Sequence, residues 1–300
     1  MLHLSSEAAL FAKSAVLISG TARSGTTLVG NIIHSMKSVE YVYEPPTLVL
    51  LLALINNINE HNWKLLYEAY LYEEFFLNAL AGRAINCNTT DDSSIYRVKP
   101  NDEIESRLRK HTSKQLLQQR SLGSIIAFKI PSPHLIPKLK EYYPSMRVVV
   151  VTRNAIDTLN SLIAKKWFSK ESEKSDLIWP FSIIDGIHIP YFVKVCDQKD
   201  WIAMSELDRA AYYYIRSCEY ESSIDGKIEV NYSVLMQNPL NEVERIAELL
   251  GLKFGEMTRS IIGGIARKDI PRNSQILSGI RSDLREKVLY HSSQCEEQAR

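Results

Sequence analysis

Residues 15–30 have the sequence AVLISGTARSGTTLVG. The apolar run at its start, residues 15–19, is typical of a buried parallel strand. It leads into a loop with glycines at positions 20 and 25, and the loop opens an amphipathic helix predicted over residues 27–34. Glycines at this spacing let backbone N–H groups surround an oxyanion at a helix N-terminus, where the helix dipole also favours negative charge. The segment predicts a P-loop-like strand, loop and helix that bind an anion.

The loop differs at one position from the nucleotide-binding pattern G-x-x-x-x-G-K-[ST]. Thr26 stands where that pattern has lysine, and Arg23 supplies a positive charge from inside the loop. The missing lysine argues against chemistry at the γ-phosphate of ATP. A glycine-rich turn that binds nothing is the alternative, but the strand, both glycines, the arginine and two threonine hydroxyls occur together and favour anion binding.

Further apolar runs at residues 124–129, 147–152 and 227–230 predict three more buried strands. Helical periodicity fits residues 61–80, 103–119, 134–142, 156–166, 205–221, 239–250 and 281–297. Strands that alternate with helices predict an α/β fold with a central parallel sheet flanked by helices. We expect one domain over residues 1–300, with an irregular lid or acceptor loop near 166–190 and a C-terminal helix near 281–297.

The composition is that of a globular chain: 300 residues, of which 45% are apolar and 24% charged. Lys and Arg number 36 and Asp and Glu 35, so the chain lacks the broad basic surface of nucleic-acid-binding proteins. The four cysteines have no zinc-ligand spacing, which predicts a reduced protein without structural metal. The first residues lack a signal-peptide pattern, and the longest apolar run, residues 48–55, is too short to span a membrane. We therefore expect a cytoplasmic protein with neither a nucleic-acid nor a membrane partner.

The segment Ala22-Arg-Ser-Gly-Thr-Thr27 resembles the 5′-phosphosulfate loop, P-[KR]-[ST]-G-T-T, of the sulfotransferase family. Ala22 departs from the usual proline. Arginine followed by T-T-L is more similar to the tyrosylprotein and bacterial branches than to the cytosolic steroid and phenol branch. The resemblance implies that the donor is 3′-phosphoadenosine 5′-phosphosulfate (PAPS) and the product adenosine 3′,5′-bisphosphate (PAP). It also implies that the loop residues bind the donor: Arg23, Ser24, Gly25, Thr26 and Thr27.

A second match follows the strand predicted at residues 147–152. Arg153 ends that strand and Ser161 lies two turns into the next helix, where an arginine fork and a hydroxyl can hold a phosphate. By itself, an arginine at a strand end is more often an ion-pair partner. In sulfotransferases an arginine and a serine at this spacing bind the 3′-phosphate, so the resemblance implies that role here.

A weaker match lies in the segment VNYSVLMQNP, residues 230–239. The resemblance implies that Tyr232 lies near the adenine, and a core tyrosine is the alternative. The family often adds basic contacts to the 3′-phosphate near its C-terminus. The candidates are Arg267, Lys268 and Arg272, for which a solvated basic loop is the alternative.

Sulfuryl transfer needs a base for the acceptor's proton and cations where negative charge develops. Arg23 lies in the anion loop, and Lys129 ends a predicted strand at the sheet edge where α/β folds bind ligands. The resemblance implies that Glu44 is the base, because it lies 21 residues after Arg23, where the tyrosylprotein branch carries its catalytic glutamate. A helix cap or an ion-pair partner is the alternative for Glu44.

His134 is the rival base. The cytosolic branch has a K-T-H segment with a catalytic histidine, but Pro131 occupies that position here. We expect His134 to open the helix after Pro133 and to face outward.

The predicted lid mixes aromatic and charged side chains. Acids among aromatic rings suit a cationic acceptor through ion pairing and cation–π contact, and a solvated lid over two core tryptophans is the alternative. If the acids line the pocket, the acceptor class includes guanidinium alkaloids of the saxitoxin type. The lid residues concerned are Trp167, Glu173, Asp176, Trp179, Asp185 and His188.

Together these features predict a PAPS-dependent sulfotransferase of secondary metabolism that requires no metal ion. It would act on a hydroxyl or nitrogen of a small polar acceptor. A P-loop nucleotide or small-molecule kinase is one alternative, which the absent lysine disfavours. A non-enzymatic, nucleotide-gated binding module is the other, which the presence of Arg23, Lys129 and Glu44 disfavours. The motifs leave the oligomeric state open.

Overall fold

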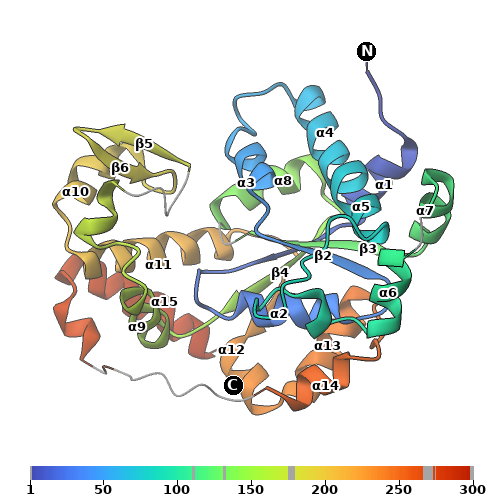
Figure 1. Cartoon of the computed structure of the whole chain (residues 1–300). Helices are drawn as coiled ribbons and strands as arrows, with labels where there is room; N and C mark the ends of the chain where they lie inside the picture. The colour runs from blue at the N-terminus through green and yellow to red at the C-terminus, as the bar shows by residue number, and fades with distance from the viewer. Residues whose placement is uncertain are drawn as a thin grey trace.

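A parallel sheet with strand order β2-β3-β1-β4-β7 forms the centre of the protein (Figure 1). The computed structural model describes residues 2–109, 112–130, 133–174, 180–265, 273 and 275–297. The strands are β1 (Val16–Ser19), β2 (Val39–Tyr43), β3 (Ile125–Lys129), β4 (Arg147–Thr152) and β7 (Ile228–Asn231). Helices cover both faces, so the α/β fold predicted from the sequence is confirmed.

The strands predicted from apolar runs are confirmed. Their apolar sequences reflect burial on both faces of the sheet. On β1, Leu17 belongs to the core on one face, while Val16 and Ile18 belong to the core on the other. The edge strand β2 was not predicted. A buried carboxylate interrupts its apolar pattern, and that charge is neutralised by a helix distant in sequence: Glu40 accepts hydrogen bonds of 2.7 and 2.9 Å from Arg107.

One face of the sheet is covered by α1 (Ser6–Ser14), α3 (Pro46–Ala53), α4 (Glu60–Glu68), α5 (Leu77–Leu80) and α8 (Ile136–Tyr142). The helix predicted at 61–80 is present, with a π-helical stretch, Ala69–Phe76, between α4 and α5. The helix predicted at 103–119 is wrong as one element, since α6 (Asn101–Arg109) and α7 (Lys114–Ser121) replace it. Ser113 caps α7 by accepting a hydrogen bond from the N–H of Leu116, which starts a new helix there.

The other face is covered by α2 (Thr26–His34), α12 (Tyr232–Gln237), α13 (Pro239–Leu250) and α14 (Thr258–Gly263). Beside the sheet stand α9 (Ala155–Ala164), α10 (Gln198–Ala203), α11 (Glu206–Ser222) and α15 (Ser282–Glu297). The C-terminal helix predicted at 281–297 is thus confirmed. No helix within the described ranges is long and apolar enough to cross a membrane.

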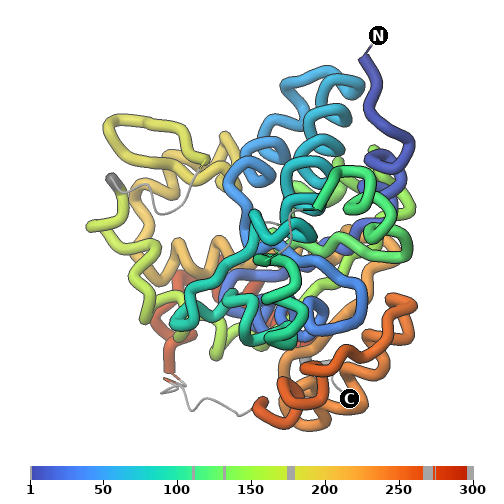
Figure 2. Tube along the Cα trace, turned by 45° about the vertical axis from the view of Figure 1, so that its right-hand side comes forward, coloured from blue at the N-terminus to red at the C-terminus, as the bar shows by residue number. Residues whose placement is uncertain are grey.

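The region expected to be an irregular lid contains a β-hairpin, β5 (Phe181–Ile184) and β6 (Ile187–Pro190). Its turn is Asp185-Gly186, with φ angles of 51° and 76°, as a tight hairpin turn requires. The expectation of an irregular lid is therefore wrong for this part. The hairpin stands apart from the central sheet in both views (Figures 1 and 2).

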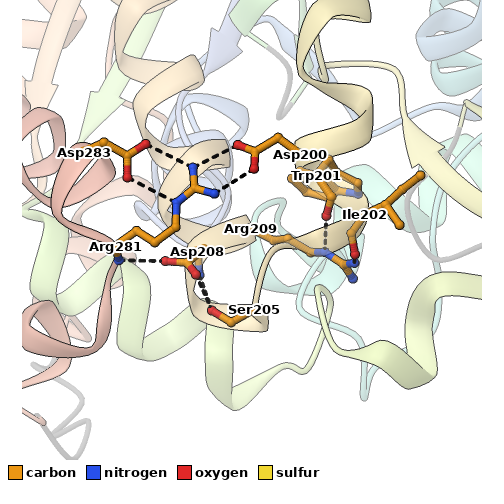
Figure 3. Close-up of polar contacts among 8 residues, drawn as sticks. All are labelled: Asp200, Trp201, Ile202, Ser205, Asp208, Arg209, Arg281 and Asp283. Atoms are coloured by element: carbon orange, nitrogen blue, oxygen red, sulfur yellow. Dashed lines mark hydrogen bonds and ion pairs between the residues drawn. The ribbon is translucent and has the colours of Figure 1, made fainter.

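An ionic cluster ties α10, α11 and α15 together beneath the hairpin. Figure 3 shows the guanidinium of Arg281 between the carboxylates of Asp200 and Asp283, at 2.7 to 3.1 Å. The backbone N–H of Arg281 donates to Asp208 of α11 at 2.9 Å. Arg209, next on α11, donates to the carbonyl of Trp201 at 3.0 Å. These contacts hold α10, which follows the hairpin in the chain, against α11 and α15.

Candidate active site

A cavity of about 1230 Å³ opens at the carboxyl ends of the central strands. Of the residues predicted for the anion loop, the Arg153–Ser161 pair, Tyr232 and the Lys129–Glu44 pair, Ser24 alone is missing from its lining. Ser24 is buried inside the loop, and its hydroxyl has no hydrogen-bond partner among the described residues. The others line the cavity: Arg23, Gly25, Thr26, Thr27, Glu44, Lys129, Arg153, Ser161 and Tyr232.

The loop after β1 is a tight turn that leads directly into α2. The N–H of Ser24 donates to the carbonyl of Thr21 at 3.0 Å, and Arg23 has a φ of 73°, in the left-handed region. Gly25 has a φ of 107°, and a Cβ there would lie 2.4 Å from the ring of Tyr232. Only glycine fits at position 25, and the first N–H groups of α2 follow it at the cavity wall.

Two arginines meet on the β4 side of this loop. Arg23 donates from Nε to the hydroxyl of Ser161 at 3.1 Å, and Arg153 donates to the carbonyl of Arg23 at 3.1 Å. The guanidinium of Arg153 also lies 4.6 Å from the ring centroid of Tyr232 and 3.4 Å from the carboxylate of Asp157. Its buried Nε has no partner among the described residues. Two cations, a hydroxyl and an aromatic ring therefore share one end of the cavity.

Lys129 and Glu44 meet on the other side of the loop. Tyr43 and Lys129 are paired in the β2–β3 register, so Glu44, the residue after Tyr43, lies beside Lys129. The Lys129 ammonium lies 2.7 Å from a Glu44 carboxylate oxygen, 3.0 Å from the Thr27 hydroxyl and 4.2 Å from the Tyr43 ring centroid. Because the side chain of Glu44 is 32% exposed and that of Lys129 only 4%, the carboxylate is the more accessible partner.

Glu44 does not cap α3, since Pro45 occupies the N-cap position and makes no side-chain cap. Of the two alternatives to a catalytic role, the ion pair is the one present, and its partner is the other predicted catalytic residue.

The expectation that His134 faces outward is wrong. Its ring packs against Tyr191, with centroids 4.6 Å apart, and against Tyr220 at 5.5 Å. Burial, together with the charge of Arg216, lowers the pKa of His134 to about 3. The imidazole is absent from the cavity lining and lies behind Tyr191, which belongs to it.

Among its described residues, the lid contributes aromatic rings to the cavity rather than acids. Glu173 is 2.6 Å from Arg209, so its charge is already paired, and Asp185 lies in the hairpin turn. The idea that the lid acids line the pocket is therefore wrong for both. His188 stacks on Phe181 within the hairpin, with centroids 3.9 Å apart. We define the aromatic wall as the rings on this side of the cavity: Trp167, Phe168, Tyr191, Phe192 and Tyr213.

Several residues named from the sequence lie outside the described residues. They are Asp176 and Trp179 of the lid, and Arg267, Lys268 and Arg272 near the C-terminus.

Two carboxylates that were not predicted as site residues do line the cavity. Asp91 and Asp92 belong to a loop whose position is fixed by Asn31 of α2, which donates to the carbonyl of Asp92 at 3.0 Å. The exposed carboxylate of Asp92 lies 3.4 Å from Arg97. The irregular stretch of residues 86–101 is typical of a binding loop, but no sequence pattern brings it to the sheet edge, so the contact of these two residues with the cavity needed the structure. The described residues hold no group of three or more potential metal ligands.

Residues 15–256 match the sequence profile of a family described as "Sulfotransferase family". Comparison with curated proteins found no matching sequence. Among solved structures, the sulfotransferase domain from the curacin biosynthetic pathway is similar with a TM-score of 0.50 and 10% identity, over 94% of this chain and 97% of that one. At this identity the likeness shows a shared fold.

Two other sulfotransferase structures match with lower TM-scores. The sulfotransferase STF9 from Mycobacterium avium gives 0.48 at 11% identity, over 94% of this chain and 76% of that one. The sulfotransferase domain of the Synechococcus PCC 7002 olefin synthase gives 0.43 at 16% identity, over 95% and 93%.

Proposed function

The chain belongs to the sulfotransferase family, and from this premise we propose that it transfers the sulfuryl group of PAPS to a hydroxyl or nitrogen of a small polar acceptor. The observation that carries the proposal is the arrangement around the loop after β1. Arg153, Arg23 and Ser161 lie on one side of that loop, and the Lys129–Glu44 pair lies on the other. The two phosphate groups of the donor would bind along the part of the cavity that these residues line.

The donor would bind with its 3′-phosphate at Arg153 and Ser161 and its 5′-phosphosulfate at the loop of residues 23–27. One unpartnered donor on a cavity-lining residue supports this orientation, the Nε of Arg153. A phosphate oxygen would satisfy this N–H, and a buried donor without a partner is otherwise costly. Tyr232 would lie beside the adenosine, where it also stacks on Arg153.

In the transfer step, the acceptor oxygen or nitrogen attacks sulfur while the bond from sulfur to the 5′-phosphate oxygen breaks. The acceptor's proton goes to the carboxylate of Glu44, and the electron pair of the broken bond stays on the phosphate of PAP. Arg23 and Lys129 stabilise the negative charge that builds on the leaving phosphate. Lys129 touches both Glu44 and Thr27, so one ammonium connects the base to the loop that holds the leaving group.

The acceptor would lie against the aromatic wall. That wall gives the cavity aromatic rings, and Asp91, which accepts hydrogen bonds from Ser93, adds a carboxylate; rings and a carboxylate suit a cationic acceptor. Guanidinium alkaloids of the saxitoxin type are one class of cationic acceptor to test. Both O- and N-transfer fit an acceptor of this kind, and a role in secondary metabolism is part of the proposal.

Thermal unfolding with nucleotides tests the donor assignment. PAP without Mg²⁺ should stabilise the protein, by about 2.7 kcal/mol at a concentration 100 times its Kd. Stabilisation that requires Mg·ATP would instead indicate the kinase. Binding of PAP without sulfuryl transfer to any acceptor in a panel of amines, guanidines, phenols and alcohols would indicate the non-enzymatic module.

A further inference from the structure

The helix α11 holds the anion-binding loop through two side chains. The N–H of Ala22 donates to the phenol oxygen of Tyr213 at 3.0 Å, and the hydroxyl of Thr21 donates to the carboxylate of Glu221 at 3.2 Å. All four residues are buried. The loop therefore depends on a helix nearly 200 residues away in sequence, with separations of 191 and 200 residues for the two contacts.

The turn from Thr21 to Ser24 explains why the contact at Ala22 matters. The N–H of Ser24 donates to the carbonyl of Thr21, so Ala22 and Arg23 are the second and third residues of the turn. Arg23 has a positive φ and Ala22 does not, which is the pattern of a type II turn. Such a turn favours proline at its second position and glycine at its third. This chain has alanine and arginine there, so neither residue fixes the turn through its own backbone preference, and the left-handed conformation of Arg23 is unfavourable by itself.

We propose that Tyr213 is a positioning residue, whose hydroxyl fixes the turn of the anion-binding loop by accepting the Ala22 N–H where a proline would otherwise fix it. The inference rests on the proposed function for its catalytic consequence. Only a residue with an N–H can use this contact, so the alanine and the tyrosine form a matched pair. By holding the turn, Tyr213 keeps Arg23 in the conformation from which its side chain reaches Ser161.

The surroundings of Tyr213 suit a fixed anchor. Its ring packs between Phe192 and Phe168, with centroids 4.9 and 5.6 Å away. Burial raises the pKa of its phenol, which keeps the hydroxyl neutral at every physiological pH. Because the ring also belongs to the aromatic wall, the acceptor side of the cavity and the donor loop share one rigid side chain.

Substituting Ala22 and Tyr213, singly and together, tests the proposal. The ring of a proline at position 22 would occupy the space into which the N–H now points, against the Tyr213 hydroxyl. Ala22→Pro alone should therefore disturb the loop, and Tyr213→Phe alone should leave the N–H without its acceptor. In the double variant, the missing hydroxyl makes room for the proline ring, which then fixes the turn through its own φ.

Four proteins are compared: wild type, Tyr213→Phe, Ala22→Pro and the double variant. For each, the Kd for PAP, the KM for PAPS, the turnover number and the urea midpoint of unfolding are measured. We expect Tyr213→Phe to weaken PAP binding about 2- to 12-fold, the range for one lost neutral hydrogen bond. We expect Ala22→Pro to weaken it further and the double variant to bind more tightly than Ala22→Pro, so the two substitutions are not additive.

Tyr212→Phe provides the matched control. Tyr212 is the preceding residue of α11, is also buried, and its hydroxyl accepts from the N–H of Lys194 at 3.2 Å and donates to Asp197 at 2.7 Å. This variant should lose stability without a change in PAP affinity, and Ala22→Pro should not rescue it. Equal PAP affinity of Tyr213→Phe and wild type, or additive effects in the double variant, would overturn the proposal.

The unfolding measurements separate this inference from the proposed function. If the wild type neither binds PAP nor transfers sulfate, the function is wrong. Non-additive urea midpoints in the four proteins would then still support the Ala22–Tyr213 pair, and additive midpoints would refute it.

Discussion

The carboxylate of Glu44 lies 2.7 Å from the ammonium of Lys129, which joins the proposed base to a cation of the proposed transition state. The contact follows from register, since Lys129 ends β3 opposite Tyr43, the last residue of β2. Lys129 is nearly inaccessible while Glu44 is partly exposed to the cavity, so the lysine holds the carboxylate where an acceptor can reach it.

Replacing Glu44 by glutamine should leave the fold and PAP affinity nearly unchanged and reduce transfer by roughly 10²- to 10⁴-fold, the usual effect of losing a general base. Glutamine keeps the shape of the side chain but cannot accept the proton. Steady-state rates with one acceptor, beside PAP affinity, provide the measurement. His134→Ala is the control and should remain active. An active Glu44→Gln with an inactive His134→Ala would move the role to His134.

Lys129→Met should lower turnover at saturating PAPS, because under the proposed mechanism the charge that it removes stabilises the transition state. The unbranched side chain of methionine fits the space that the buried methylene groups of Lys129 now occupy. Since Lys129 contacts Glu44, the double variant with Glu44→Gln should lose less than the product of the two single losses. A multiplicative loss in this double-mutant cycle would mean that the two groups act independently.

Three substitutions at Arg23 separate its charge from its backbone conformation. Arg23 has a φ of 73°, which glycine adopts without strain and alanine does not. Arg23→Gly should thus keep the loop and lose the cation, Arg23→Ala should lose both, and Arg23→Lys should retain most activity. Turnover at saturating PAPS and the urea midpoint are compared. Wild-type turnover in Arg23→Gly would restrict Arg23 to a role in the fold.

Arg153→Ala should weaken PAP binding much more than it lowers turnover, because the 3′-phosphate is remote from the transferred group. Each charge-assisted hydrogen bond lost should cost roughly 1.5–3 kcal/mol. The substitution also leaves Asp157 without this arginine, so Ser161→Ala provides a milder second variant with a smaller effect in the same direction. Calorimetric titration with PAP measures both. Unchanged PAP affinity in Arg153→Ala would rule out Arg153 as a binding residue for the 3′-phosphate.

Glu221 predicts a pH dependence of stability. Burial raises its pKa from 4.5 to about 7. The folded state therefore binds more protons than the unfolded state between these values, so the group's contribution is fully present below pH 4.5 and is lost as the pH rises to about 7. This loss amounts to roughly 3 kcal/mol.

His134 has the opposite dependence, since its lowered pKa makes folding less favourable below pH 6.5. The test is consequently the difference between wild type and Glu221→Gln, which keeps an acceptor for Thr21. Urea unfolding from pH 4.5 to 8 should show wild type losing stability relative to the variant up to pH 7 and no further change above it. Parallel curves would contradict the raised pKa.

Much of the fold could be predicted, because parallel strands buried on both faces leave an apolar signature in the chain. The strand β2 could not be predicted, because the charge of its buried Glu40 is neutralised by Arg107 and no local sequence pattern reveals an ion pair with a residue so distant in the chain. The hairpin had a local signal, Asp185-Gly186 between apolar residues, which is among the strongest of all turn signals.

Some residues of the candidate site could likewise be placed from the sequence, and others could not. Residues fixed by strand ends, such as Lys129 and Arg153, could be placed at one edge of the sheet from the sequence. The exposure of His134 could not, because it depends on packing against Tyr191 and Tyr220. Asp91 and Asp92 reach the cavity through a loop anchored by Asn31, a contact that no periodicity encodes.

The hairpin β5–β6 forms a sheet of its own, and the residues at either side of it, Phe168 and Phe192 among them, carry most of the aromatic wall. The catalytic and phosphate-binding groups come instead from the ends of the central strands and the helices that follow them. Under the proposed function, four of the five rings expected to contact the acceptor are therefore encoded in one segment, residues 167–192, and Tyr213, which also holds the donor loop, is the exception. Exchange of that segment alone should therefore alter the proposed acceptor side while leaving Arg23, Lys129 and Glu44 in place.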